Sequence, residues 1–444
     1  MKKLLVVLIS FLLISVPAES KSPKGMINST LDESGIPRSS IAISIKNVDT
    51  GKPVYEMNEN MLMHPASVQK ILTLPAIMDV LGEDYKFKTT IYSRGTDGYV
   101  IKLGADPYFS TSDLKNLVKH INSDKVKTVY LDDSIVENKD WGEGWQWDDD
   151  LNTCMPRFNA YNLDKNLIKI TVIPTKDGAK ASIINPSKYP LVFFNNVITS
   201  KETSVNVTRD SSVASNALTL NGTVSKPVIL TIPANNLRGY FHSKLAQLLS
   251  ERNIYLKNAF APSKVAQSDV EISSVTHEIS QAEKDVLVNS DNMVIEILAK
   301  IAGEKAYGKT GTDVSGIRVF NDYCNKIGLD KTGMRLVDAS GVSKNNLVSA
   351  NFVTEYLVAN KDNKVYSKMA TPGVGTLESR MIPLKENLRA KTGTLSDISS
   401  IAGFLTSKSG KHYVFCIIIN NPNSTSSDKK ALEDYLIRDL YLKG

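Results

Sequence analysis

Cysteine and histidine are scarce in this chain, and their spacing excludes several kinds of site. The three cysteines, Cys154, Cys324 and Cys416, lie far apart, so at most one disulfide could form and at least one thiol stays free. Cys416 stands in the apolar run YVFCIII and is predicted to be a small core residue. No Cys-x-x-Cys pair occurs, and no histidine stands three or four residues from another. The sequence therefore predicts no metal site.

The chain also lacks basic clusters and low-complexity segments. Its formal net charge of +6 is spread along 444 residues, without a Lys/Arg run that carries interleaved aromatic residues. This pattern makes nucleic acid a poor candidate partner and fits at most weak attraction to an anionic polymer or surface. The length predicts about three domains, and a hydrophobic fraction of 42% with 23% charged residues is enough apolar material for several cores.

Long hydrophobic runs are absent except near residue 1. The basic residues of MKK precede the uncharged run LLVVLISFLLISV, and VPAES offers small residues for cleavage after Ala18 or Ser20. This layout predicts a secretory signal peptide over residues 1–20. A buried element of the fold and a retained anchor are the alternatives, although the run is short against the roughly 20 residues of a spanning helix. We expect an exported protein, periplasmic or otherwise extracytoplasmic, with at most peripheral membrane contact.

Hydrophobic periodicity divides the chain into three parts. Helices and strands mix before about residue 90 and after about residue 278, and short alternating strands dominate between them. The clearest segments are strands at about 41–47, 52–57, 398–406 and 412–419, and helices over 65–82, 281–303 (with a polar break), 313–328 and 427–442. We predict an α+β protein in which residues 21–92 and 276–444 form one discontinuous domain. A β-rich insertion over 93–275, with a nested β-domain near 166–232, splits it.

The first motif that carries chemistry is Ser67-Val68-Gln69-Lys70, at the start of an apolar helix. Residues i and i+3 share a helix face, so the Lys70 amine can reach the Ser67 hydroxyl. A serine hydroxyl is a weak nucleophile until a base takes its proton, and a lysine with a lowered pKa can be that base. Helix-terminal N–H groups could hold an oxyanion. The same spacing, explained by a cap and a solvated lysine, recurs at Ser112–Lys115, Ser426–Lys429 and Ser427–Lys430.

The second motif, Ser290-Asp291-Asn292, falls in the polar break between two helical stretches. Ser290 could relay a proton between a base and a leaving group, and Asn292 could hydrogen-bond a substrate amide. An ordinary N-cap for the helix MVIEILAKIAG is the alternative interpretation, in which Ser290 or Asp291 caps. The two interpretations are compatible.

The third motif, Lys-Thr-Gly, occurs three times, at 309–311, 331–333 and 391–393. To take part in catalysis with the serine of the first motif, this triplet would need to lie on a strand edge that faces the nucleophile. There the lysine would supply positive charge and threonine hydroxyls would bind a carboxylate, while the glycine would let a substrate backbone approach closely. The first copy is predicted to be a linker between helices and the second a turn. Only Lys391-Thr392-Gly393, followed by Thr394, ends a possible strand before a hairpin.

In this order, Ser-x-x-Lys, Ser-x-Asn and Lys-Thr-Gly resemble the signatures of serine penicillin-binding proteins and serine β-lactamases. The long gap between the first two is similar to that of the D-alanyl-D-alanine carboxypeptidase/endopeptidase family (class C low-molecular-mass penicillin-binding proteins of the penicillin-binding protein 4 or DacB type, peptidase family S13). VDASGVSKNN also resembles this family, with Ala339 and Lys344 where glycine and arginine are usual. The resemblance runs over most of 26–444 and implies an antiparallel sheet flanked by helices.

The resemblance also implies roles for the motif residues. Ser67 would be the acylated nucleophile, Lys70 its general base and Ser290 the proton relay to the leaving D-alanine. The substrate would be bound by Asn292, Lys391, Thr392 and Thr394, with the N–H groups of Ser67 and Thr394 as oxyanion hole. Peptidoglycan stem peptides and cross-links would be substrates and β-lactams covalent inhibitors, with no metal or organic cofactor.

Two other functions share the motifs. A serine β-lactamase would leave the long insertion unexplained, and no separate deacylating carboxylate is recognisable by pattern. A penicillin-binding or cell-wall-binding module without turnover is disfavoured because all three motifs are intact.

Other conspicuous residues are interpreted as structural. Trp145 and Trp147 alternate in WQWDDD, so at least one is predicted to pack inward, and the acidic trio is read as a solvated or capping loop rather than a carbohydrate or calcium site. Asp338 and Ser340 are interpreted as a turn near the cleft, and His64 as a structural histidine.

Overall fold

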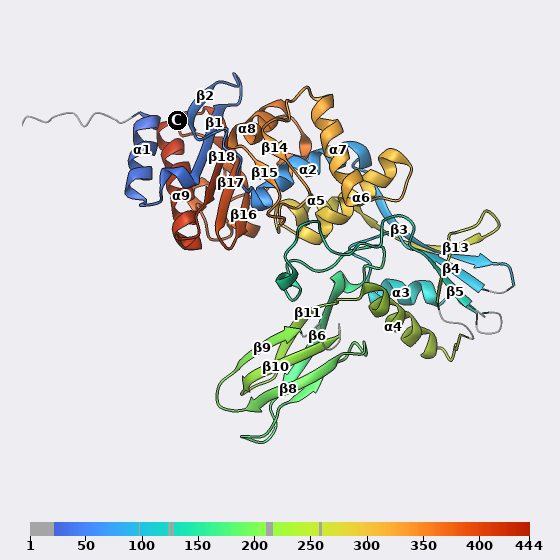
Figure 1. The fold of residues 1–444 in the computed structure, drawn as a ribbon. Coiled ribbons are helices and arrows are strands. Elements are labelled where there is room, and N and C mark those ends of the chain that lie inside the picture. The colour runs from blue at the N-terminus through green and yellow to red at the C-terminus, as the bar shows by residue number, and fades with distance from the viewer. Residues whose placement is uncertain (1–21, 97, 123–125, 127, 210–215, 257–259) are drawn as a thin grey trace, which may run out of the picture.

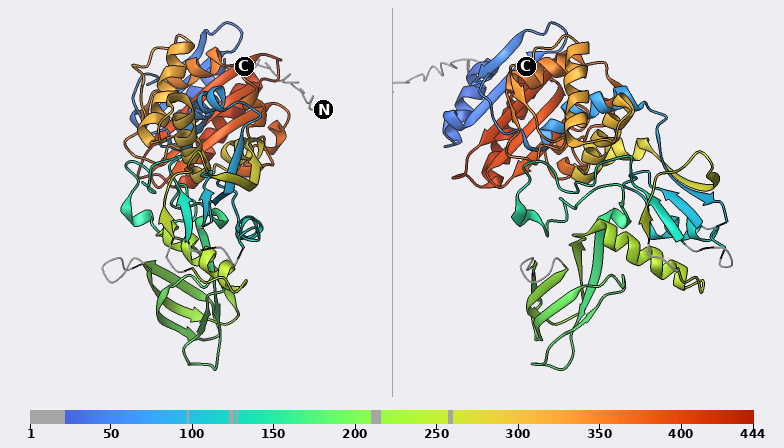
Figure 2. Two further views of the ribbon diagram at one scale, coloured as in Figure 1. Left: turned by 90° about the vertical axis from the view of Figure 1, so that its right-hand side faces the viewer. Right: turned by 45° about the vertical axis from the view of Figure 1, so that its right-hand side comes forward.

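A computed structural model describes residues 22–444 except 97, 123–125, 127, 210–215 and 257–259. The predicted signal peptide lies outside the described residues. Figures 1 and 2 show a sheet with helices on both faces, a second sheet beyond helices α5 to α7, and a β-rich part that projects away from both. Among the described residues, no helix combines the length and the apolar character needed to cross a bilayer.

The first sheet joins the two ends of the described chain. Its order is β16-β17-β18-β1-β2, with every neighbouring pair antiparallel. The strands are β16 (Leu388–Leu395), β17 (Ile398–Thr406), β18 (His412–Asn420), β1 (Ile41–Asn47) and β2 (Pro53–Met57). The four predicted strands are confirmed to within about one residue. β16 lies at one edge of the sheet, which leaves part of its backbone free to meet another chain.

Both faces of this sheet are covered by helices, so its central strands are apolar on both sides. Helices α1 (Pro23–Glu33) and α9 (Ser426–Lys443) pack together on one face, and α8 (Ala350–Ala359) packs on the other. The predicted core position of Cys416 on β18 is confirmed, because its side chain is fully buried. Cys154, Cys324 and Cys416 are all free, and Cys154 is exposed.

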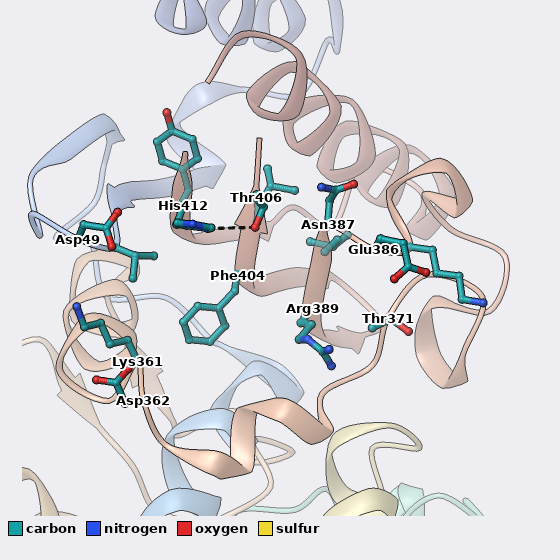
Figure 3. Close-up of a pocket in the computed structure, with 15 residues that line it drawn as sticks. Asp49, Lys361, Asp362, Thr371, Glu386, Asn387, Arg389, Phe404, Thr406 and His412 are labelled. Atoms are coloured by element: carbon teal, nitrogen blue, oxygen red, sulfur yellow. Dashed lines mark hydrogen bonds between the residues drawn. The ribbon is translucent and has the colours of Figure 1, made fainter. Parts of the chain in front are cut away.

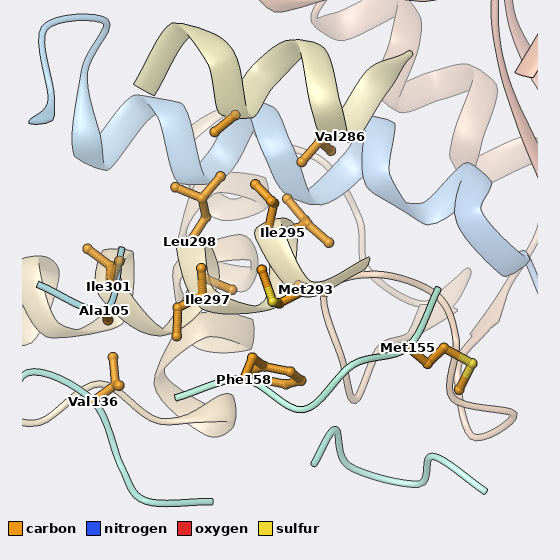
Figure 4. Packing of buried hydrophobic residues seen from close by; sticks show 14 of the residues in the cluster. Ala105, Val136, Met155, Phe158, Val286, Met293, Ile295, Ile297, Leu298 and Ile301 are labelled. Carbon is orange, nitrogen blue, oxygen red and sulfur yellow. The ribbon is translucent and has the colours of Figure 1, made fainter. Parts of the chain in front are cut away.

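A helical layer stands between the two sheets. It consists of α2 (Lys70–Leu81), α5 (Ile279–Leu287), α6 (Asn292–Tyr307) and α7 (Asp313–Lys326). The residues of α6 from Asn292 to Gly303 are all buried, as expected of a helix enclosed by neighbours. Figure 4 shows its side chains between α5 on one side and the loop that carries Phe158 on the other.

One predicted helix end was wrong. The α6 helix continues beyond Gly303 to Tyr307, and Gly308 caps it in the left-handed region with φ 64°. A Cβ at Gly303 would collide with the Ser315 side chain of α7, so this glycine allows two helices to approach closely and does not end one.

The second sheet is where the chain enters and leaves the inserted region. Its order is β12-β5-β4-β3-β13, with strands β3 (Lys86–Arg94), β4 (Gly98–Lys102), β5 (Thr128–Asp132), β12 (Ala261–Pro262) and β13 (Val270–Glu278). β3 and β13 pair side by side, with Thr89 opposite Val275. The predicted domain borders near residues 92 and 276 fall within these paired strands, and the division there stays a prediction. Helices α3 (Thr111–Val118) and α4 (Leu237–Ser250) accompany this sheet.

Two three-stranded sheets form the part that projects away. Their orders are β8-β10-β9 and β11-β6-β7. The strands are β6 (Leu167–Ile173), β7 (Ser182–Ile184), β8 (Val192–Thr199), β9 (Ser204–Arg209), β10 (Ala217–Val224) and β11 (Val228–Pro233). These strands occupy the span in which a nested β-domain was predicted. A short ribbon of β14 (Met334–Arg335) and β15 (Leu347–Val348) lies near α8.

Candidate active site

Ser67 and Lys70 stand at the start of α2, as the first motif predicts. Residues 66–69 form a 3-10 turn that runs directly into α2. Lys70 is fully buried, and its Nζ donates to Ser67 Oγ at 2.8 Å, to Asn292 Oδ1 at 2.6 Å and to the Ser340 carbonyl at 2.8 Å. One amine therefore holds the candidate nucleophile and reaches the second motif.

Burial makes the Lys70 amine easier to deprotonate. Desolvation lowers the pKa of Lys70 to about 8, against the opposing pull of the carboxylates of Asp338, Glu296 and Asp291. A lysine with its pKa near 8 is deprotonated in a useful fraction of molecules near neutral pH, which the ordinary value of 10.5 would not allow.

Ser290 lies in the short loop between α5 and α6, and Asn292 is the first residue of α6. Ser290 has a left-handed backbone, with φ 62°, and its Oγ accepts a hydrogen bond from Lys391 Nζ at 2.8 Å. Asp291 is the N-cap of α6, where its side chain accepts from the Val294 N–H at 3.0 Å. The capping interpretation is confirmed for Asp291, and it leaves the side chains of Ser290 and Asn292 free for the predicted catalytic roles.

Asn292 ties the inserted region to this junction. Its Oδ1 accepts from Lys70, and its Nδ2 donates to the Cys154 carbonyl at 2.9 Å. Cys154 lies in the loop between β5 and β6, so a backbone group of the insertion forms part of the wall of the site.

Lys391 lies on β16 with its ammonium end in the same cluster. It is fully buried, and besides Ser290 its Nζ bonds to the Thr392 carbonyl at 2.7 Å. Desolvation lowers the pKa of Lys391 well below its ordinary value, and the nearby charge of Lys70 lowers it further. Thr392 is almost buried, whereas Thr394 is exposed.

The outer edge of β16 is only partly covered. The Ala390 N–H bonds to the Ala370 carbonyl at 3.0 Å, and beyond this bridge no strand among the described residues pairs with that edge. Backbone groups alternate between the two sides of a strand, so the N–H groups of Thr392 and Thr394 also point to the outer edge. An extended peptide could add to this edge beside Ser67.

Gly393 allows β16 to lie against the nucleophile. A Cβ there would stand 2.9 Å from both the Ser67 nitrogen and the Pro65 carbonyl oxygen, and it would also collide with Ser400 Oγ. Ser400 Oγ donates to the Pro65 carbonyl at 2.6 Å, which fastens β17 to the turn that begins α2. The sequence predicts that Gly393 lets a substrate backbone approach, which stays a prediction; the structure shows that the backbone of Ser67 lies against it.

The other two Lys-Thr-Gly copies lie elsewhere. Lys309 is exposed between α6 and α7, where Gly311 makes a single bridge to Val136. Lys331 is in a turn before β14. Of the three copies, only the one at 391–393 lies on a strand, as predicted.

Sequence reasoning missed three groups that shape the site: the carbonyls of Ser340 and Cys154, and the carboxylate of Glu296. Glu296 is buried on α6 and accepts hydrogen bonds from the N–H groups of Ala339, at 3.1 Å, and Ser340, at 2.8 Å. Burial, and the charge of Asp338, raise the pKa of Glu296 above its ordinary value. Backbone carbonyls carry no signature in a sequence, and Glu296 looked like an ordinary helical residue.

The side-chain contacts of Asp338 agree with the interpretation of this residue as part of a structural turn. The Asp338 carboxylate accepts from the Trp145 indole at 3.0 Å, the N–H groups of Gly341 and Ser343 at 2.8 and 2.7 Å, and the Asn346 side chain at 2.8 Å. His64 Nδ1 bonds to the Asn346 carbonyl at 3.0 Å. Trp145 is buried and Trp147 is 87% exposed, in line with the predicted alternation.

A separate hollow of about 560 Å³ lies on the first sheet (Figure 3). Arg389 of β16, Phe404 of β17 and His412 of β18 line it. Arg389 stands two residues before Lys391, but none of the motif residues lines this hollow. No group of three or more potential metal ligands (His, Cys, Asp, Glu) occurs in the part of the chain that the structure describes.

Known proteins resemble this chain in both sequence and fold. The profile of the family described as D-Ala-D-Ala carboxypeptidase 3 (S13) matches residues 24–438. The chain is 26% identical over 438 residues to D-alanyl-D-alanine carboxypeptidase DacB of Haemophilus influenzae, covering 91% of this chain and 90% of that protein. It is 22% identical over 438 residues to D-alanyl-D-alanine carboxypeptidase of Actinomadura sp. (strain R39), covering 90% of this chain and 80% of that protein.

The fold comparison agrees. The crystal structure of penicillin binding protein 4 from Haemophilus influenzae matches with a TM-score of 0.81 at 22% identity, covering 94% of this chain and 98% of that one. This match confirms the predicted α+β fold class. The chain belongs to the D-Ala-D-Ala carboxypeptidase (S13) family.

Proposed function

We propose that this protein removes the terminal D-alanine from peptidoglycan stem peptides through an acyl-enzyme on Ser67. The observation that carries the proposal is the pairing of two buried lysines with two serines. Lys70 Nζ lies 2.8 Å from Ser67 Oγ, and Lys391 Nζ lies 2.8 Å from Ser290 Oγ. The first pair can activate a nucleophile, and the second can deliver a proton to a leaving group.

The acylation step follows from these positions. Neutral Lys70 takes the proton of Ser67 Oγ, which attacks the carbonyl carbon of the penultimate D-alanine. The resulting oxyanion accepts hydrogen bonds from the N–H groups of Ser67 and Thr394, the second of which points to the open edge of β16. The C–N bond then breaks, and the proton that Lys70 took passes by way of Ser290 to the leaving amine, so Lys70 is neutral again. The serine ester and free D-alanine are the products.

Deacylation returns the enzyme to its starting state. Lys70 takes a proton from a water molecule, which attacks the ester carbonyl carbon. Lys70 then gives this proton to the released Ser67 oxygen. A stem peptide shortened by one residue leaves. When the scissile bond joins two stem peptides, the same two steps give endopeptidase action.

Binding of the substrate falls to the groups around these serines. Lys391, Thr392 and Thr394 would bind the terminal carboxylate, and a bound carboxylate favours the ammonium form of Lys391 and so raises its pKa. Asn292 donates one Nδ2–H to the Cys154 carbonyl, which leaves its second N–H for a substrate carbonyl. β-Lactams would acylate Ser67 in the same place and act as covalent inhibitors.

The buried acids near Lys70 do not favour the β-lactamase alternative. Glu296 and Asp338 accept backbone N–H groups of the 339–343 segment and so hold that segment in place. A deacylating carboxylate would instead need to hold a water molecule beside Ser67. The assembled contacts between Lys70 and Ser67 also speak against a module without turnover.

We also propose that the protein is exported and acts outside the cytoplasm, in the periplasm where one exists. The support is the charged, apolar and small-residue pattern of residues 1–20, together with the location of the proposed substrate. Sequencing the N-terminus of protein recovered from outside the cytoplasm tests this, and a start at residue 19 or 21 is expected.

The function is tested by incubating the full chain with benzylpenicillin and locating the adduct by mass spectrometry. A slow-clearing adduct on Ser67, with release of D-alanine from a peptide ending in D-Ala-D-Ala, is the expected result. Rapid hydrolysis of the penicillin would support a β-lactamase instead. An adduct without peptide turnover would support the binding module, and an adduct on a different serine would overturn the assignment of the nucleophile.

A further inference from the structure

A strained turn in the inserted region lies next to the second motif. Asp164, Lys165 and Asn166 are consecutive non-glycine residues with φ values of 52°, 57° and 59°. The left-handed region is unfavourable for residues that carry a Cβ, so such a run persists only where its surroundings hold it. The turn immediately precedes β6.

Side-chain contacts hold both ends of the turn. The Asp164 carboxylate accepts from the Thr111 N–H at 2.8 Å and from the Tyr240 hydroxyl at 3.2 Å. The side-chain oxygen of Asn166 accepts from the Leu163 N–H at 2.9 Å, and this side chain is completely buried. The residues at either end of Lys165 are therefore anchored within the insertion.

The side chain of the middle residue reaches helix α5 and the start of helix α6. Lys165 Nζ lies 3.2 Å from Asp291 Oδ2 and 3.6 Å from Asp285 Oδ2. It also lies 4.3 Å from the centre of the Tyr108 ring, whose hydroxyl donates to Asp285 Oδ2 at 3.0 Å. The Lys165 side chain is 35% exposed, so this cation is partly shielded from water.

Asp285, in the last turn of α5, and Asp291, the N-cap of α6, flank the loop that presents Ser290. The Asp291 N–H bonds to the Asp285 carbonyl at 3.0 Å, which closes the loop. Asp291 caps α6 and is flanked by Ser290 and Asn292, which contact Lys391 and Lys70 respectively. Without a cation between them, two carboxylates would repel each other across a loop whose serine already has an unfavourable φ.

We propose that Lys165 is a positioning residue that acts through Asp285 and Asp291 to hold the loop from Ser290 to Asn292 in its reactive geometry. The inserted region then contributes to the proton-transfer step as well as to the wall of the site. This proposal rests on the proposed function, because it concerns the rate of acylation at Ser67.

The test compares Lys165→Met with Lys165→Arg and with Lys169→Met, a control at an exposed lysine on β6. Steady-state release of D-alanine from a D-Ala-D-Ala peptide and the acylation rate with benzylpenicillin are measured for each full-length variant. For Lys165→Met we expect kcat and the acylation rate to fall about tenfold to a hundredfold, the loss typical of a misplaced reacting group. KM should change by less than about threefold, because the substrate contacts are intact. Lys165→Arg should restore most of the rate, and Lys169→Met should match the unaltered protein.

Hydrogen exchange of a peptide that spans 286–294 supplies a readout independent of activity. We expect faster exchange there in Lys165→Met than in Lys169→Met, with the melting temperatures of the two variants equal. Unchanged exchange and unchanged rates would overturn the proposal. An increase in KM alone would also overturn it, because it would make Lys165 a substrate contact. Failure of the unaltered protein to label at Ser67 would instead refute the proposed function, and the exchange result would still decide the role of Lys165 in the loop.

Discussion

Replacing Lys391 by methionine tests the choice among the three Lys-Thr-Gly copies. The substitution keeps an unbranched side chain in a fully buried position but removes the hydrogen bonds to Ser290 Oγ, at 2.8 Å, and to the Thr392 carbonyl, at 2.7 Å. It also removes the charge proposed to meet the substrate carboxylate. The same substitution at Lys309 and Lys331 provides matched controls within one chain.

The expected loss can be set from these contacts. A hydrogen bond to a charged group is worth about 1.5–3 kcal/mol, so the bond to Ser290 and the proposed contact with the carboxylate together give roughly 3–6 kcal/mol. This corresponds to a fall of about 10²- to 10⁴-fold in the acylation rate. Thermal stability should not fall, because a buried lysine is costly to desolvate and an apolar side chain of similar length is not.

The assay is the rate of covalent labelling of Ser67 by a fluorescent penicillin, followed by stopped flow and confirmed by mass spectrometry, with melting temperatures measured in parallel. Lys309→Met and Lys331→Met should label within about twofold of the unaltered protein, because surface substitutions rarely perturb a distant site. Labelling of Lys391→Met within about threefold of normal would refute the reasoning, and so would an equal loss in either control.

Three further predictions concern the nucleophile and its support. In Gly393→Ala the new methyl group would stand 2.9 Å from the Ser67 nitrogen and so disturb one oxyanion donor. Labelling should therefore fall by about 10²- to 10³-fold, the loss typical of one such donor. Near-normal labelling would contradict this. The labelling rate should rise with pH, reach half its maximum near pH 8 and level off about one pH unit above, because protonated Lys70 is not a base and burial lowers the pKa of Lys70 to about 8. A flat profile from pH 6 to 9 would oppose this assignment. Asp338→Ala should destabilise the fold by about 4 kcal/mol or more in urea unfolding, since it leaves several buried donors unpaired. Asp330→Ala, at an exposed turn, should change stability by less than about 0.5 kcal/mol, and equal effects of the two would count against the proposed network.

The sequence by itself determined the secondary structure around the site and the identity of its side chains. Apolar runs joined by a turn located β17 and β18 to within one residue, because a strand covered on both faces is apolar along most of its length. Ser67, Ser290 and Lys391 were recognisable as candidates because the chemistry predicted for them depends on side chains at short spacings. The position of the third motif on a strand, and not in a linker or turn, distinguished it from its copies.

Tertiary structure alone decided how these groups meet. The carbonyls of Ser340 and Cys154 contact Lys70 and Asn292, yet any residue type could supply a carbonyl, so no pattern marks them. Lys165 looked like one charged residue among many. Its role depends on a left-handed turn and on carboxylates more than a hundred residues away in the chain. Such contacts depend on how separate segments pack, and a local sequence pattern does not contain that information.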